Sequence, residues 1–302
     1  MKKYSVRPAR FSDIEAAHEI IAKQNIIDYG SAMRTIEDLQ KSWQSIDLNN
    51  DTCAAYADGK LAGYAELLDN DSPFIYLAER NNVDLAFQLL MILEEQATSR
   101  MKETVNLFTR ISEKNNTLLQ LFASNGYKSN LSFLIMELVM NEPPVTPQWP
   151  ANITVRPFTK DQDEQVTYRT DEEASQDKGY HDPLSYEDWV KRMGLERESF
   201  DPSLWFLACE GSEVAGAALN VPAKESNTGW VDHLSVRQSW RNRGIGKALL
   251  LHTFGEFYRR GIHTIKLSVD SKSLTYAPRL YENLGMKTDQ QYHIYRKEIR
   301  PK

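Results

Sequence analysis

Apolar positions in the first half of the chain switch between strand-like and helix-like spacing. Val6 lies in a short strand-like stretch, 4–8, and Ser12-x-x-Glu15 then has the form of a capping box before apolar residues at helical spacing. The rest of this half predicts a helix at about 35–45, strands at 52–57, 61–68 and 74–77, a helix through Leu85, Leu89 and Leu93, a strand at 104–109, a helix at 116–124 and a strand at 131–140. The turn residues 57–60 between two of these strands indicate a hairpin.

A proline-rich stretch, 141–152, interrupts this pattern. Four of the chain's 12 prolines lie in it, and proline continues neither a helix nor a central strand. We therefore divide the chain into a domain at 1–142, a linker at 143–152 and a second domain at 153–302.

The pattern restarts after the linker. Three stretches of the first half recur in the same order in the second: 6–8 at 155–157, 57–63 at 210–216 and 121–127 at 280–286. We interpret the halves as two copies of one α/β unit, each running strand, helix, helix, three strands, helix, strand, helix, strand. The hairpin-linked strands should pair antiparallel, and the later strand–helix–strand crossover should give a parallel pair.

A glycine-containing loop distinguishes the second copy. Gly244 and Gly246 lie between a strand-like run, 230–236, and a helix-like run that extends to about Arg260. Glycine permits a sharp turn and a close approach, and the N-terminus of the following helix offers unpaired N–H groups and a positive dipole. No acid occurs from 233 to 255, so the loop is a candidate site for an anion such as a pyrophosphate.

The first copy lacks these features. It has no glycine from 64 to 125, and Phe122 stands where the second copy has Tyr281. We therefore expect any chemistry to belong to the second half and the first half to be degenerate and non-catalytic.

Charge and composition exclude several functions. The chain has 302 residues and a net charge of −6, which argues against nucleic-acid or membrane-surface binding. It has no apolar run of about 18 residues and no signal-peptide core, so a cytoplasmic protein is expected. Cys53 and Cys209 have no metal-ligand neighbours at useful spacing, so reduced thiols and no metal are expected.

Two motifs of the second half resemble those of the GCN5-related N-acetyltransferases. Arg241-x-x-Gly244-x-Gly246 resembles that family's acyl-CoA pyrophosphate loop, and the stretch from Leu280 to Met286, with Tyr281, resembles its second motif. The resemblance implies two tandem domains of an α/β (α+β) class, each a mixed, mostly antiparallel twisted sheet flanked by helices. This arrangement is similar to the tandem members of the family that include mycothiol synthase.

The resemblance also implies roles for individual residues, with acetyl-CoA as the co-substrate. Leu234 and Val236 would offer backbone groups to the pantetheine arm and the thioester. Tyr281 would protonate the departing thiolate as general acid, a role that suits its ordinary pKa near 10. The remaining cofactor contacts would come from Ser273, which stands where the family often has Asn, and mainly from the backbone of Arg241, Asn242, Arg243, Gly244, Ile245, Gly246 and Lys247.

The general base is left open between two neighbours on one strand. Asp232 and His233 point to opposite sides of a regular strand, so one of them faces the acceptor. His233 has the more suitable unperturbed pKa. The structural alternative is that each of them completes a surface or core hydrogen bond, and a water molecule is the third candidate for the base.

The acceptor region is acidic. The helices after the linker carry many Asp and Glu residues, which form either a rim that favours a cationic amine or a solvated face. The loop 179–183 is a candidate border of the acceptor cleft. We predict an acyl-CoA-dependent N-acyltransferase that transfers acetyl to a primary amine of a small molecule or peptide by direct attack, acting as a monomer or homodimer. The alternative is a non-catalytic acyl-CoA sensor or scaffold.

Overall fold

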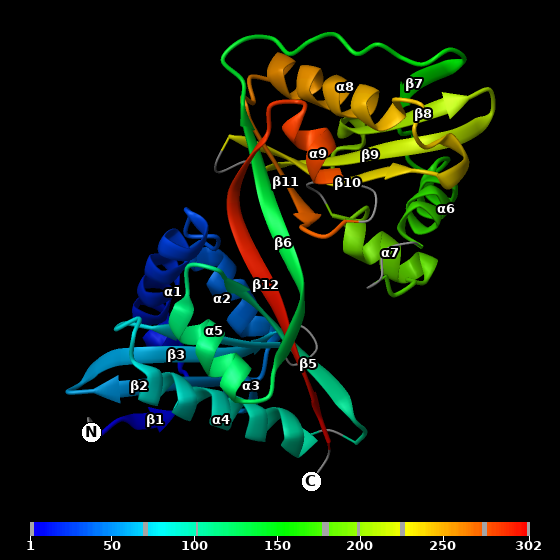
Figure 1. Ribbon diagram of the computed structural model, residues 1–302. Helices are drawn as coiled ribbons and strands as arrows, with labels where there is room; N and C mark the ends of the chain where they lie inside the picture. Colours follow the sequence, from blue (N-terminus) through cyan, green and yellow to red (C-terminus); the bar gives the residue numbers. More distant parts are fainter. Residues whose placement is uncertain are drawn as a thin grey trace. The chain divides into compact units, whose positions relative to one another are not determined.

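The computed structural model describes residues 3–68, 72–100, 102–176, 181–197, 200–223, 227–273 and 277–300. The chain forms two compact units, which are Met1–Phe133 with Gln290–Lys302, and Leu134–Asp289 (Figure 1). These units differ from the two sequence halves at the last strand of each half. Most of the final strand of the chain contributes to unit 1, and the second half of the strand before the linker contributes to unit 2. The division at 142 and 153 stays a prediction about the repeated sequence.

The helices and strands of the first half follow the predicted order, with one extra short helix, α3. They are β1 (Ser5–Arg7), α1 (Ile14–Tyr29), α2 (Ile36–Ser45), α3 (Leu48–Asp51), β2 (Thr52–Ala57), β3 (Lys60–Leu68), β4 (Ser72–Leu77), α4 (Val83–Arg100), β5 (Val105–Ser112), α5 (Asn116–Ser124) and β6 (Lys128–Val139). In unit 1, β1-β2-β3-β4 form an antiparallel sheet, and β5 pairs antiparallel with β12 from the end of the chain.

The second half repeats this order. Its elements are β7 (Ile153–Pro157), α6 (Glu164–Ser175), α7 (Tyr186–Met193), β8 (Trp205–Glu210), β9 (Glu213–Ala223), β10 (Thr228–Val236), α8 (Ile245–Arg259), β11 (Thr264–Asp270), α9 (Ala277–Glu282) and β12 (Lys287–Ile299). The strand order in unit 2 is β6-β11-β10-β9-β8-β7, with β10 and β11 parallel and the pairs among β7 to β10 antiparallel. The expected fold class is confirmed.

One predicted pairing of the first half stays a prediction. The crossover after β4 should give a parallel β4–β5 pair; the described residues give the sheet β1-β2-β3-β4, and residues 69–71, directly before β4, lie outside the described residues. The amide of Gln24, from α1, bonds to the outer edge of β4, where it accepts from Leu77 N–H at 3.1 Å and donates to Ile75 O at 3.0 Å. A side chain therefore occupies the edge of β4 at these two residues.

Helices cover both faces of each sheet. In unit 1, α1 and α2 bury Ile21, Leu39 and Trp43 on one face of the sheet, and α4 buries Leu89 and Leu93 against the other. In unit 2, α8 covers one face of the sheet, and α6 and α7 cover the opposite face (Figure 1). The apolar residues at helical spacing in the sequence are therefore the ones that the helices bury against the sheets.

The same ion pair occurs at the start of each half and supports the repeat. Arg7 donates to Asp13 at 2.7 and 2.9 Å, and Arg156 donates to Asp163 at 2.6 and 2.7 Å. Each pair ties the first strand of its half to the start of the first long helix. Two-pronged pairs of this kind fix geometry as well as charge.

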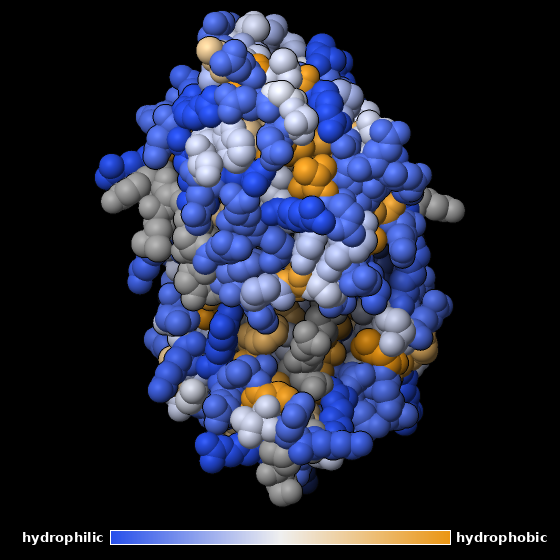
Figure 2. Space-filling view, turned by 90° about the vertical axis from the view of Figure 1, so that its right-hand side faces the viewer, coloured by the Kyte–Doolittle hydropathy of each residue, from blue (hydrophilic) through white to orange (hydrophobic). Residues whose placement is uncertain are grey.

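Surface polarity matches the composition. No helix in the described part of the chain is long and apolar enough to cross a membrane. On the face that Figure 2 shows, hydrophilic residues predominate, and hydrophobic residues gather only in small groups. Cys53 and Cys209 are both buried free thiols.

Candidate active site

The glycine loop leads into α8 with its backbone N–H groups unpaired. Gly244 is the N-cap with φ of 87°, and Asn242 also has a positive φ of 59°. The first backbone bond after the loop runs from Ala248 N–H to Gly244 O at 3.0 Å. Within the residues that the structure describes, no acceptor is found for the N–H groups from Asn242 to Lys247. With no acid in the first turn of the helix, this row of donors suits an anion.

The arginine side chains near the loop are largely engaged within the protein. Arg243 pairs with Glu210 at 2.6 Å, and Arg237 pairs with Glu173 at 2.7 Å. Arg241 donates to two backbone carbonyl groups at 3.1 and 3.0 Å. An anion at the loop would therefore be held mainly by the backbone, while the arginines fix the shape of the loop.

The outer edge of β10 is open beside the loop. Its parallel ladder with β11 ends at the pair Val231–Leu267, so Leu234 and Val236 lie beyond the last pair. Their backbone groups point away from β9, because the N–H of the residue after Val236 donates across to β9. The Val236 carbonyl accepts from Arg241 Nε at 3.1 Å, so the open groups on this edge are the Val236 N–H and the backbone groups of Leu234. This stretch of edge is suited to pair with an extended chain of amides.

The loop, the open edge and α9 converge. A Cβ atom at Gly246 would lie 3.7 Å from the side chains of Leu280 and Val236 and 4.0 Å from that of Leu234. These are ordinary contacts, so the protein itself does not require glycine at 246. A ligand that approaches the backbone closely would require it.

A bulge in β10 decides which way its polar side chains point. The register with β9 shifts between Val231 and His233, which leaves Asp232 as the extra residue. Val231 and Leu234 pack in the core under α8, whereas His233 and Ser235 bond to α6 on the opposite face. Asp232 is exposed. His233 therefore faces the side of the sheet covered by α6 and α7.

A buried carboxylate of α6, which the sequence analysis missed, receives His233. Asp171 is 4% exposed and lies 2.8 and 3.0 Å from Nδ1 of His233. It also accepts from Ser235 Oγ at 2.6 Å and Trp189 Nε1 at 3.0 Å. Burial favours a raised pKa for Asp171, but His233, Ser235 and Trp189 together hold that pKa well below its usual range. In the sequence, Asp171 was one of many acids, and its place on the buried side of α6, with Thr167, Thr170 and Ser175, has no apolar periodicity to mark it.

Tyr281 and Ser273 lie on either side of the start of α9. Tyr281 is 7% exposed, and burial raises the pKa of its phenol to about 12. No hydrogen bond to its hydroxyl is found among the described residues. Ser273 lies in the turn after β11, where its N–H donates to Asp270 O at 3.1 Å. The phenol of Tyr281 is thus neutral at ordinary pH. Tyr281 directly follows Leu280, whose side chain lies near Gly246 of the loop.

Comparison with known proteins identifies the fold family. Residues 164–286 match the Acetyltransferase (GNAT) family. A GCN5-related N-acetyltransferase from Sphaerobacter thermophilus has a crystal structure that matches 99% of this chain and 96% of that chain, with a TM-score of 0.83 and 32% sequence identity. The chain belongs to the GCN5-related N-acetyltransferase (GNAT) family.

Further relatives support a tandem GNAT arrangement. Mycothiol acetyltransferase of Streptomyces scabiei is 30% identical over 155 residues, so the match spans 51% of this chain and about half, 49%, of the length of that relative. That of Streptomyces bingchenggensis is 25% identical over 256 residues, 80% of this chain and 78% of its own. A tandem GNAT protein from the clavulanic acid pathway shares the fold over 99% of this chain, with a TM-score of 0.70 and 12% identity.

The two GNAT copies can be aligned through their strand ladders. Gly63 pairs with Leu77 in the first half, as Gly216 pairs with Val236 in the second. Leu77 thus corresponds to Val236, and Ile75 to Leu234. These are the β4 residues whose backbone groups bond to Gln24. The chain's own amide occupies in the first half the strand edge that is open in the second.

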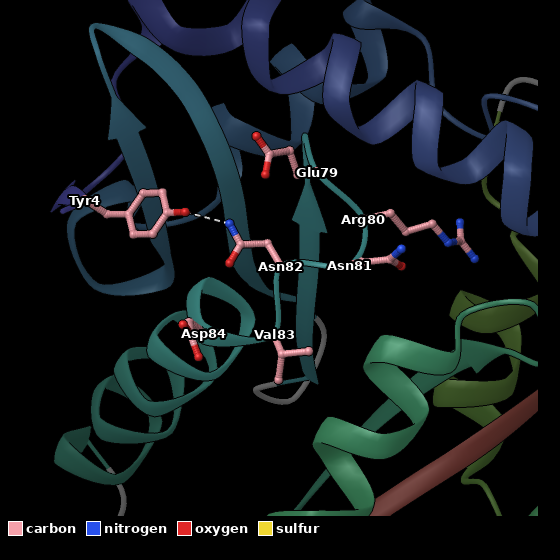
Figure 3. A pocket seen from close by; sticks show the side chains of 7 residues that line it. All are labelled: Tyr4, Glu79, Arg80, Asn81, Asn82, Val83 and Asp84. Carbon is pink, nitrogen blue, oxygen red and sulfur yellow. Dashed lines mark hydrogen bonds between the residues drawn. The ribbon is translucent and has the colours of Figure 1, made fainter. Parts of the chain in front are cut away.

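The start of α4 also differs from the start of α8. Asn82 caps α4 by accepting from Leu85 N–H at 3.1 Å, and Asp84 lies in the first turn. An open hollow of about 620 Å³ adjoins this end, where Asn82 also donates to the Tyr4 hydroxyl and the carboxyl groups of Glu79 and Asp84 line the wall (Figure 3). Capped N–H groups and two carboxylates disfavour a phosphate there.

Replacing Gln24 by alanine is expected to lower the free energy of unfolding by about 1–3 kcal/mol, because buried N–H and C=O groups of β4 lose their partners. Lys23→Ala, an exposed neighbour on α1, is the control and should change stability by less than about 0.5 kcal/mol. Urea unfolding of both variants measures the difference. Equal stability of the two variants would show that the Gln24 hydrogen bonds do not contribute to the free energy of unfolding.

The acid-rich region gives little support to an acidic rim. Glu173 pairs with Arg237, and Glu172 lies 3.0 Å from His181. These carboxylates are used inside the protein, which favours the structural alternative for them. Residues 179–180 of the loop that was a candidate cleft border lie outside the described residues.

Proposed function

We propose that the chain transfers an acetyl group from acetyl-CoA to a primary amine of a small molecule or peptide. The observation that carries this proposal is the row of unpaired N–H groups from Asn242 to Lys247 beside the open edge of β10. The row suits the pyrophosphate, and the edge at Leu234 and Val236 suits the amides of the pantetheine arm. When bound, acetyl-CoA supplies the activated acyl group as a thioester.

His233 and Tyr281 would move the protons. His233 accepts a proton from the attacking amine, directly or through water, and Tyr281 donates its phenolic proton to the thiolate as the C–S bond breaks and the C–N bond forms. Asp232 is the weaker choice of base, because it is the extra residue of the bulge and its side chain is exposed. Ser273 would line the cofactor side near the start of α9.

The acceptor is proposed from the relatives. Two proteins that match this chain are mycothiol acetyltransferases, so an amine acceptor of the type those enzymes use is the first to test. The assay measures release of free thiol from acetyl-CoA over a panel of amines that includes such acceptors. Amine-dependent thiol release is expected. Tight acetyl-CoA binding with no release on any amine would favour an acyl-CoA sensor instead.

We further propose that the first half does not bind acetyl-CoA. The Gln24 contacts and the capped start of α4 support this. Calorimetric titration of the full chain with acetyl-CoA is expected to give one site per chain. A stoichiometry of two would contradict the proposal.

A further inference from the structure

Three donors converge on the carboxylate of Asp171. It receives Nδ1 of His233, the hydroxyl of Ser235 and the indole N–H of Trp189, at distances from 2.6 to 3.0 Å. Burying an ionised carboxylate is costly unless it is paired and hydrogen-bonded. The three hydrogen bonds explain how the ionised Asp171 carboxylate is stabilised in the core. They do not explain why the core contains a charged group at this position.

The first half shows that the fold does not need this cluster. Asp13 and Asp163 precede equivalent helices, and the β3–β4 and β9–β10 ladders align the strands. By these alignments, the first half has Ile21, Phe74 and Tyr76 where the second half has Asp171, His233 and Ser235. Over the described residues the β3–β4 register is also continuous, without the bulge that turns His233 toward α6. The carboxylate, the imidazole and the bulge thus occur together in one half and are absent together from the described part of the other.

We propose that Asp171 is the positioning residue for His233, which it holds in the tautomer with Nδ1 protonated and Nε2 unprotonated, the form that accepts a proton from the acceptor amine. This inference rests on the proposed function for the identity of that amine. An ionised carboxylate accepts a hydrogen bond and donates none, so the imidazole nitrogen that faces it must carry the proton. Neutral imidazole then has its lone pair on Nε2, the nitrogen away from Asp171.

Ser235 and Trp189 orient the carboxylate itself. Each donates one hydrogen bond to Asp171 from a different element, β10 and α7. The low pKa of Asp171 keeps it ionised at working pH, so that it accepts from all three neighbours at once. The charge also stabilises the imidazolium that forms when His233 accepts a proton.

The direct test is the tautomer of His233 in the free protein, read from the ¹⁵N chemical shifts of its ring by NMR. The wild-type protein is expected to show Nδ1–H with an unprotonated Nε2 when His233 is neutral. A neutral ring with Nε2–H would overturn the proposal, whatever the activity. This measurement needs no variant and no acetyl-CoA, so it stands apart from the test of the proposed function.

The matched variants are Asp171→Asn and Asp163→Asn. The second removes a buried carboxylate directly before the same helix, which pairs with Arg156, so it reports the general cost of such a change. In Asp171→Asn, the amide is able to donate to Nδ1. A shift toward the Nε2–H tautomer and a fall in kcat of about tenfold or more are expected, with the KM for acetyl-CoA nearly unchanged. Asp163→Asn should keep the wild-type tautomer and kcat.

Two results would contradict the positioning role. One is an Asp171→Asn protein with the wild-type tautomer and kcat, and the other is an equal loss of kcat in both variants. If Asp171→Asn does not fold, Ser235→Ala serves as the second variant, because it removes one hydrogen bond from the carboxylate but keeps its charge. It should lower kcat by a few-fold and retain the Nδ1–H tautomer, and an unchanged kcat would then count against the proposal. Failure of every amine to react in the wild-type protein would contradict the proposed function alone.

Discussion

Replacing Tyr281 by phenylalanine is expected to lower kcat for acetyl transfer by about 10²-fold or more, with the KM for acetyl-CoA changed by less than about threefold. A positioned general acid contributes about 10²–10⁴-fold, and the hydroxyl group is the only part of the side chain that this variant removes. Steady-state thiol release at saturating amine measures the effect. Burial raises the pKa of Tyr281 to about 12, so the group stays protonated from pH 6 to about pH 10, and its ionisation should not shape the rate in that range.

Tyr258→Phe is the matched control for this prediction. Tyr258 packs against the same core cluster as Tyr281 but belongs to α8 and has no role in the proposed chemistry. It should retain the wild-type kcat. An equal fall in both variants would assign the loss to packing and not to proton transfer.

Replacing Gly246 by aspartate is expected to weaken acetyl-CoA binding by about 10²-fold, and replacing it by alanine by about tenfold, which is about 1.4 kcal/mol. The added Cβ meets the protein only at ordinary distances of 3.7 Å or more, so folding tolerates it. The same atom enters the space that the proposed pyrophosphate uses, and a carboxylate there also repels it. Calorimetric titration with acetyl-CoA gives the affinities.

Gly255→Ala tests whether the helix alone accounts for such changes. Gly255 lies in the same helix, α8, and an added Cβ would have no neighbour within 4 Å. Alanine for glycine stabilises a helix by up to about 1 kcal/mol, so both alanine variants should melt at or above the wild-type temperature. Only Gly246→Ala should lose affinity. Unchanged affinity in Gly246→Ala would remove the loop from the proposed binding site.

The order of elements could be predicted because it depends on local signals. The hydrophobic period and the glycine turns each lie within a few neighbouring residues, and they predict the repeated order of strands and helices. The capping box predicted at Ser12 and Glu15 is wrong in detail, because Asp13 is the N-cap of α1 and accepts from Arg10 N–H. The glycine loop and Tyr281 were found from such local signals, because each motif is short. Their roles stay predictions, whereas membership of the GNAT family is confirmed.

The remaining features depend on contacts between residues far apart in the sequence. No residue near Asp232 in the sequence indicates the bulge, yet the bulge determines on which face of β10 the His233 side chain lies. Asp171 meets His233 across 62 positions, and Gln24 meets Ile75 across 51. Spacing along one segment cannot show such partners, so the sequence predicted neither the carboxylate beside His233 nor the closed edge of β4.

Each unit contains strand residues from the end of the other half of the sequence, and this exchange has consequences for synthesis on the ribosome and for evolution. Unit 1 contains residues 290–302, so it cannot be completed while the ribosome has yet to translate that stretch, although its first 133 residues emerge early. A gene fragment that encodes only residues 153–302 would lack the part of β6 that lies beside β11 in unit 2. Deletion of the first half would thus damage the second. A lineage is therefore expected to retain the first half even without catalysis in it, and recombination at the linker would not yield two independent proteins.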